Sequence, residues 1–128
     1  MEHLVKNWQI FEHDSFPQNR AKKLTKKYKK EVINLFKNLQ TYLNSLQADL
    51  NPEELKRSHS FVHEEKKGLY AIDARPPVKG IQLRLYIYPQ LIKKELHIMI
   101  IGNKKTQSMD IKIAHSEIKK EENLDKKD

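Results

Sequence analysis

The apolar residues of this chain change their spacing near residue 69, and this change narrows the choice of fold more than any other feature. Before residue 69 they recur in steps of three and four, which places them on one side of a helix: Leu24, Tyr28, Val32, Leu35, Phe36, Leu39, Tyr42, Leu43, Leu46 and Leu50. After it, residues 69–75, 81–88 and 95–101 form segments rich in Ile, Leu and Tyr, with lengths typical of strands. Helices followed by strands predict an α+β domain whose small antiparallel sheet packs against N-terminal helices.

The helical part is too long for one ordinary helix. The apolar stripe runs over roughly 30 residues, whereas helices average about 11 to 12, so we expect a break with Thr25 as the cap of the second segment. Residues 14–17 (DSFP) predict the start of the first helix, since a side-chain oxygen and an early proline both suit a first turn. Residues 51–54 (NPEE) predict another short helical turn, because Asn51 can cap it while Glu54 reaches back.

The strand segments predict a meander, to which an N-terminal strand is added. The turns at residues 76–80 and 89–94 are short enough to make successive strands antiparallel neighbours, and alternation over residues 7–13 predicts an opening strand. On the middle strand, the alternation puts Ile81, Leu83, Leu85 and Ile87 on the face toward the helices, and Gln82, Arg84, Tyr86 and Tyr88 on the other. A last helix is expected from near Ser108. Residues 121–128 are almost wholly charged, so we expect a disordered tail after a single domain of residues 1–120.

Several classes of protein are excluded by what the sequence lacks. The 128 residues contain no cysteine, so a disulfide framework, a thiolate zinc site and a cysteine nucleophile are ruled out. HExxH, P-loop and GxGxxG motifs are also missing, and we expect no cofactor and no metal. His59 and His63 are four residues apart, but their segment is not convincingly helical and does not predict a metal site. No apolar stretch approaches the 20 or so residues of a membrane span and no secretory signal is visible, so we expect a cytoplasmic protein.

The balance of charge points toward a polyanionic partner. Lys and Arg number 25 against 17 Asp and Glu, a net charge of +8. One basic cluster falls on the predicted helix and is expected to face outward: Lys22, Lys23, Lys26, Lys27 and Lys30. This cluster is either an ordinary solvated helix face or a patch that follows phosphates, and lysine contacts to phosphate carry no base specificity.

A second basic cluster lies on the sheet half of the chain. Its members come from the ends or polar faces of three neighbouring strands and are expected to converge on one concave surface: Arg75, Lys79, Arg84, Lys104 and Lys105. Nearby, the rings of Tyr86 and Tyr88 either stack on the bases of a nucleic acid or simply cover the sheet. Convergence of these cations on one surface indicates a nucleic-acid site more strongly than the helical lysines do.

Three segments carry a family resemblance: GLYAIDAR, IQLRLYIYP and LHIMIIGNKKTQ. With the order of the predicted elements, they resemble the RelE/ParE superfamily of toxins from bacterial toxin-antitoxin modules, particularly its HigB-like and phage-derived branch. The resemblance runs from Trp8 to about Lys120. It implies a RelE-like fold with a C-terminal helix and a cognate antitoxin as partner. It also implies one of two activities: metal-independent cleavage of messenger RNA on the ribosome, as in RelE-like and HigB-like members, or poisoning of DNA gyrase, as in ParE-like members.

The resemblance also implies roles for particular residues. In RNA cleavage the ribose 2′-hydroxyl attacks the adjacent phosphate, which requires a base, cations around the phosphate and a proton donor to the leaving oxygen. By position, the cations would be Arg75, Arg84, Lys104 and Lys105, with Arg84 first as a bidentate phosphate clamp. Many nuclease members carry a histidine or tyrosine near the C-terminus, and residues 102–107 contain neither, so His97 and Tyr86 are the candidates for proton transfer. A catalytically degenerate binding protein and a structural partner of another chain stay open as alternatives.

Overall fold

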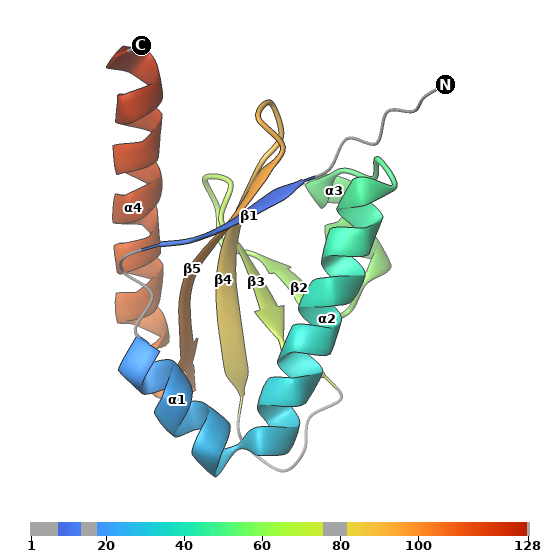
Figure 1. Ribbon diagram of the computed structural model, residues 1–128, viewed down its shortest axis with the longest axis vertical. Coiled ribbons are helices and arrows are strands. Elements are labelled where there is room, and N and C mark those ends of the chain that lie inside the picture. The colour runs from blue at the N-terminus through green and yellow to red at the C-terminus, as the bar shows by residue number, and fades with distance from the viewer. Residues whose placement is uncertain (1–7, 14–17, 76–81, 128) are drawn as a thin grey trace.

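The computed structural model describes residues 8–13, 18–75 and 82–127, and within them the predicted α+β fold is confirmed (Figure 1). The elements are, in chain order, β1 (Gln9–Glu12), α1 (Gln18–Lys27), α2 (Lys29–Gln47), α3 (Pro52–Ser58), β2 (Val62–Glu64), β3 (Tyr70–Asp73), β4 (Leu83–Gln90), β5 (Glu95–Asn103) and α4 (Gln107–Lys127). A 3-10 turn at Lys104–Thr106 joins β5 to α4.

The five strands form one mixed sheet in the order β1-β5-β4-β3-β2. Strands β2 to β5 make an antiparallel meander, as predicted for the last three, and β1 pairs in parallel with the free edge of β5. The sequence did not predict β2, because three residues are too few to show an alternating pattern.

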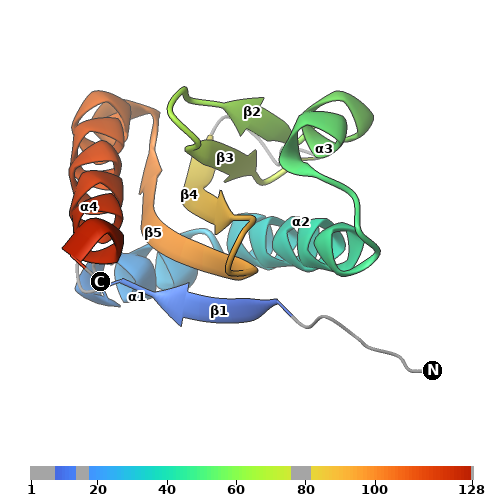
Figure 2. The same ribbon diagram turned by 90° about the horizontal axis from the view of Figure 1, so that it is seen from above.

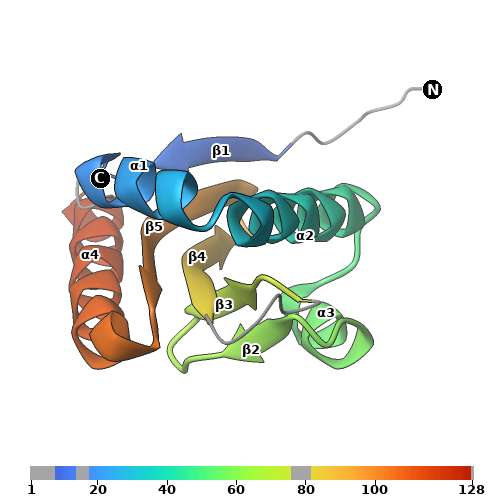
Figure 3. The same cartoon turned by 90° about the horizontal axis from the view of Figure 1, so that it is seen from below.

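Helices cover both faces of the sheet, and each face has its own core (Figures 2 and 3). Leu83, Leu85 and Ile87 of β4 lie in the core beneath α1 and α2, which confirms the face predicted for them. Tyr86 lies in the second core, against Ala114 and Ile118 of α4. This is the face that was expected to carry exposed polar residues. Because α4 covers part of it, a functional site on this face can lie only on the part of the sheet that α4 leaves open.

The long helical segment breaks at Tyr28, and not at the predicted Thr25 cap. The Thr25 hydroxyl donates to the carbonyl of Ala21 at 2.8 Å, inside α1, and no side chain caps α2. The predicted helix start at residues 14–17 lies outside the described residues. The cap of α3 is confirmed: Asn51 Oδ1 accepts from the amide of Glu54 at 2.9 Å, and Glu54 Oε1 accepts from the amide of Asn51 at 3.2 Å.

The last helix is longer than predicted. A disordered tail was expected from residue 121, whereas α4 continues through Lys127. Its later turns make local and tertiary contacts: Lys120 pairs with Glu117 at 3.1 Å, and His13, after β1, lies 3.7 Å from Glu117 and 3.8 Å from Glu121. A charged segment that continues a packed helix can extend it by such pairs, without burying a core of its own. None of the helices in the described ranges has the length and apolarity needed to cross a membrane.

Candidate functional site

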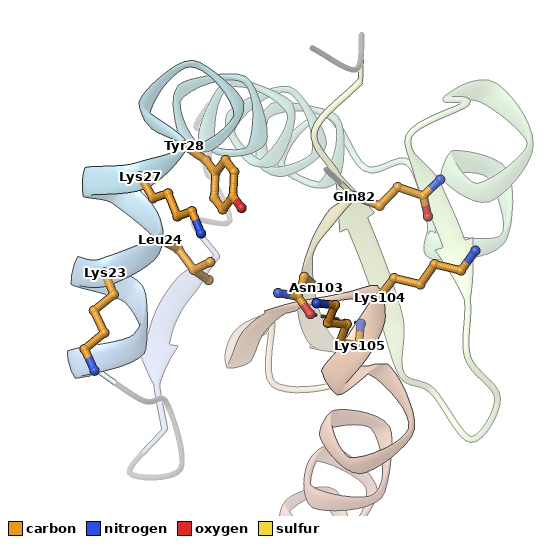
Figure 4. Close-up of a pocket in the computed structure, with 8 residues that line it drawn as sticks. All are labelled: Lys23, Leu24, Lys27, Tyr28, Gln82, Asn103, Lys104 and Lys105. Atoms are coloured by element: carbon orange, nitrogen blue, oxygen red, sulfur yellow. Dashed lines mark hydrogen bonds between the residues drawn. The ribbon is translucent and has the colours of Figure 1, made fainter. Parts of the chain in front are cut away.

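A pocket with a volume of about 690 Å³ opens between α1 and the end of the sheet (Figure 4). We call it the lysine pocket, and its lining is Lys23, Leu24, Lys27, Tyr28, Gln82, Asn103, Lys104 and Lys105. Figure 4 shows Leu24, Lys27 and Tyr28 on the α1 side, with Gln82 and Lys104 extending away from them toward β2 and β3. The fold therefore brings two of the predicted helical lysines and two of the predicted sheet lysines to the lining of one pocket, with Lys23 and Lys104 directed away from each other.

Two polar residues hold the walls of the lysine pocket in place. Asn103 Oδ1 accepts from the amides of Lys105 at 2.9 Å and Thr106 at 3.2 Å, which fixes the turn that carries Lys104. On the opposite wall, Arg20 ties α1 to the end of β5, donating to the carbonyl of Ile101 and to Asp110 Oδ1, both at 2.9 Å. The two basic walls therefore have a defined separation.

Within the described residues, the lysines of the pocket form no ion pairs with carboxylates. Among the described residues, no carboxylate lies within ion-pair distance of Lys23, Lys27, Lys104 or Lys105, and all four are exposed. Lys27 Nζ lies 5.4 Å from the centre of the Tyr28 ring, a cation–π contact that leaves its charge available. A surface of this kind attracts phosphate groups.

A second group of charged residues lies on the face of β2, β3 and β4 that also packs against α4. We call it the sheet-face cluster: His63, Glu65, Asp73, Arg75 and Arg84. Asp73 is directly opposite Arg84 in the β3–β4 ladder. Arg84 precedes the second-core residue Tyr86 by two positions, and side chains two apart on a strand share a face. His63 is opposite Ala71, another residue of that core, so three strands contribute to one surface.

Carboxylates organise the sheet-face cluster. His63 Nε2 lies 2.6 Å from Asp73 Oδ2, and Arg75 Nε donates to the same oxygen at 3.0 Å. Arg84 Nη1 donates to Glu65 Oε2 at 3.0 Å. A carboxylate on one imidazole nitrogen holds the ring in a fixed tautomer and stabilises the imidazolium that forms when the other nitrogen takes a proton, which is the arrangement of a general base. The His63 side chain is 28% exposed, so a substrate can reach it.

His63 and the carboxylates are the site residues that sequence reasoning missed. His63 was weighed only as a metal ligand with His59, because β2 is too short to predict which face it occupies. Asp73 is within the recognised segment GLYAIDAR, and its position two residues before Arg75 is the one signal available in the sequence. The role of Glu65 depends on its contact with Arg84 of β4, and no local sequence pattern predicts that contact.

Neither Tyr86 nor His97 takes the role expected of it: Tyr86 lies near Arg84 and Glu65 but is buried, and His97 lies away from the sheet-face cluster. Tyr86 is fully buried, and desolvation raises the pKa of its phenol, so it cannot stack on a base or accept a proton there, and its candidate role is corrected. His97 is 4% exposed and pairs with Tyr88, whereas Arg84 pairs with Gly102. Five residues of strand, about 16 Å, therefore separate His97 from the position of Arg84.

The remaining predicted nucleic-acid residues are dispersed. Tyr88 packs against the second core beside the His97 ring, with ring centres 5.7 Å apart, and is not part of the lysine pocket. Lys22, Lys26 and Lys30 are exposed but do not line that pocket. Lys79 lies outside the described residues.

A third polar group surrounds His97 at the other end of β5. His13 Nε2 and His97 Nδ1 are 2.7 Å apart, and His97 Nε2 is 3.0 Å from Glu95 Oε1. The ring of Phe11 stacks on His97 with centres 5.3 Å apart. Within the described part of the chain, His13, His97 and Glu121 are the group whose ligand atoms, one each, all lie within 4.8 Å of one another. We call these three residues the His13–His97 cluster.

Comparisons with protein-family models, curated proteins and solved structures found no match to this chain. The assignment of a function therefore depends on the sequence and on the geometry of these sites.

Proposed function

We propose that the protein is the toxin of a type II toxin-antitoxin module and cleaves messenger RNA on the ribosome, with the sheet-face cluster as its active site. The observation that carries the proposal is the contact between His63 and Asp73, on the same face and at the same end of the sheet as Arg75 and Arg84. This arrangement contains a base and two cations. It matches the chemistry that the resemblance to RelE-like and HigB-like toxins implies, although a different histidine takes the role assigned to His97.

In this proposal, His63 removes the proton from the ribose 2′-hydroxyl. The 2′-oxygen then attacks the adjacent phosphorus, the bond to the 5′-oxygen breaks, and the leaving oxygen takes a proton from solvent. The products are a 2′,3′-cyclic phosphate and a 5′-hydroxyl. Asp73 stabilises the imidazolium that forms, and Arg75 and Arg84 stabilise the negative charge that develops on the phosphate. A phosphate that binds Arg84 Nη1 competes with Glu65, whose Oε2 accepts from this nitrogen at 3.0 Å.

The lysine pocket supports the proposal because it lies beside the proposed active site. Gln82, which lines the pocket, precedes Arg84 by two residues, a distance of about 7 Å along an extended chain. A nucleic-acid backbone that follows Lys23, Lys27, Lys104 and Lys105 would therefore present a neighbouring phosphate to Arg84. The cognate antitoxin, in this proposal, is an acidic protein that covers the same lysines.

The decisive experiment replaces His63 by glutamine and measures cleavage of a reporter message during translation in a ribosomal extract. Loss of a general base lowers the cleavage rate by about 100- to 10,000-fold. His59→Gln is the matched control, because His59 stacks on Phe61, with ring centres 4.9 Å apart, and lies outside the sheet-face cluster. Equal cleavage by wild type and His63→Gln, or by wild type and Arg84→Ala, would remove the proposed active site.

A second candidate is a non-catalytic inhibitor of DNA gyrase, as in ParE-like toxins. It is favoured by the ion pairs that Arg75 and Arg84 already make with Asp73 and Glu65, which reduce the cationic charge offered to a phosphate. A gyrase supercoiling assay separates the two candidates. Inhibition that survives in His63→Gln, together with intact message, supports the gyrase inhibitor.

RNA binding by the lysine pocket has its own test. Each lysine-phosphate contact contributes about one to the slope of log affinity against log salt concentration, so Lys104→Ala with Lys105→Ala lowers the slope by about two. The double variant of Lys22 and Lys26 is the control, because both are exposed on α1 and outside the pocket. Equal slopes for the two double variants would contradict a specific role for the pocket.

A further inference from the structure

The His13–His97 cluster brings together three segments that are distant in the chain. His13 follows β1, His97 lies in β5 and Glu121 lies in the later part of α4. We infer that this cluster is a binding site for a divalent transition metal ion of the zinc type. The site is separate from the proposed active site, which lies at the other end of β5.

The hydrogen-bonding environment of the two imidazoles is the first argument. His97 Nε2 lies within hydrogen-bond distance of Glu95 Oε1, at 3.0 Å, whereas His13 Nδ1 lies 3.7 Å from Glu117 Oε1, which is an ion-pair distance. Glu95 favours a hydrogen on Nε2 of His97, which leaves Nδ1 of that neutral ring with a lone pair. This nitrogen and His13 Nε2 face each other at 2.7 Å, a hydrogen-bond distance. A metal ion that replaces the shared hydrogen would be bound by both nitrogens.

The carboxylates beside the two histidines, Glu95 and Glu117, are in the positions usual around the histidine ligands of a metal. Histidine ligands of metals usually donate their second nitrogen to a carboxylate, which fixes the tautomer and the orientation of the ring. Glu95 occupies this outer position for His97, and Glu117 lies at ion-pair distance from the second nitrogen of His13. The first coordination shell is therefore His13 Nε2, His97 Nδ1 and the Glu121 carboxylate, whose Oε1 is 3.8 Å from His13 Nε2.

Two nitrogens and one carboxylate make a recognised donor set. Two histidines and a glutamate bind zinc in catalytic sites, where water fills the fourth position. A cavity of about 200 Å³ adjoins the cluster, lined by Phe11, Glu12, His13, His97 and Glu121, and gives room for that water. Zinc–nitrogen bonds of about 2.0 to 2.1 Å in a tetrahedron put two nitrogens about 3.3 Å apart, so the rings need to separate by about 0.6 Å. His13 follows a short edge strand with four exposed residues, which allows this adjustment.

An ion at this position would tie the N-terminal strand and the C-terminal helix to the centre of the sheet. β1 is a short edge strand, held by the pairing of four residues with β5, by Trp8 in the first core and by the stacking of Phe11 on His97. The later turns of α4 are charged, and the contacts of Glu117 and Glu121 with His13 are what attach them to β1. Metal binding therefore stabilises the folded chain, because the three ligands are brought together only in the folded state.

The test is zinc binding to the full chain after treatment with a chelator and dialysis, measured by calorimetry and by thermal unfolding. We expect one Zn²⁺ per chain and a rise in melting temperature, while Mg²⁺ has no effect because it prefers oxygen ligands. Glu121→Gln, on a partly exposed helix position that tolerates substitution, should weaken zinc binding by at least about tenfold. His13→Gln should do the same, and His59→Gln should bind zinc as wild type does.

Two results would overturn the inference. The first is no zinc binding and no change in melting temperature, which would leave a direct hydrogen bond between the two rings. The second is equal zinc affinity in wild type, Glu121→Gln and His13→Gln, which would place the bound zinc elsewhere. Message cleavage is not a readout of this test, so its outcome is independent of the proposed function.

Discussion

Removing the guanidinium of Arg20 should destabilise the fold far more than removing any of the lysines that follow it in α1. Arg20 Nη1 donates to Asp110 Oδ1 at 2.9 Å, and the Asp110 side chain is completely buried. The other oxygen of Asp110 accepts from the Thr106 hydroxyl at 2.6 Å, so this carboxylate has no route to bulk water. Arg20→Met keeps the alkyl stem and leaves the carboxylate without its cation.

The size of the effect follows from the burial of the two partners. Breaking a fully buried ion pair costs about 3 to 5 kcal/mol, because the remaining charge is left uncompensated. The Arg20 side chain is 33% exposed, so water screens the pair and some of this cost is recovered. We therefore expect a loss of about 2 to 3 kcal/mol, which lowers the melting temperature of a domain of this size by about 8 to 12 °C.

Urea and thermal unfolding followed by circular dichroism measure this loss. Lys22→Met is the matched control, since Lys22 is exposed in the same helix and should change stability by no more than about 0.5 kcal/mol. Asp110→Asn, combined with Arg20→Met, should cost less than the sum of the single changes, because the second change removes the uncompensated charge. If Arg20→Met were no less stable than Lys22→Met, the argument from the buried carboxylate would be refuted.

Three further predictions concern hydrogen bonds and buried tyrosines. Burial raises the pKa of Tyr70 to about 12 and raises the pKa values of Tyr42 and Tyr86 as well. The stability that these neutral buried tyrosines contribute is therefore complete below pH 10 and is lost as the pH rises toward 12. Alkaline unfolding followed by tyrosinate absorbance measures this loss. Tyr70 donates to Glu53 at 3.1 Å and this bond lowers the pKa of Glu53, so Tyr70→Phe should raise that pKa in an NMR titration. Asn51→Ala removes the cap of α3 and should cost about 1 kcal/mol in urea unfolding, whereas an unchanged midpoint would contradict the cap's role.

The elements of the fold were largely predictable, because their signals are local. The spacing of apolar residues predicted the helices and the strands β3, β4 and β5, and Asn51 with Glu54 predicted the start of α3. The break at Tyr28 was placed wrongly, since Thr25 bonds within its own helix and propensity alone does not decide between neighbouring positions. β2 and the extended end of α4 were missed because both depend on partners elsewhere in the chain.

The candidate site was predictable only in part. The basic residues could be found from composition and from the resemblance, and Lys104 and Lys105 do share a pocket with Lys23 and Lys27. The carboxylates that pair with Arg75 and Arg84 changed the character of the site from a bare cationic surface to one with a positioned histidine. His63 was overlooked because its value depends on Asp73, which lies on the next strand.

By itself, the sequence determined the class of fold, the identity of most elements and the excess of positive charge, since each of these is written in neighbouring residues or in totals. Tertiary structure alone decided that α4 covers the second face of the sheet, that Tyr86 is buried and that His13 meets His97. The physical reason is that strand register and helix docking bring together side chains from distant positions, and the free energy of such contacts has no counterpart in a local pattern.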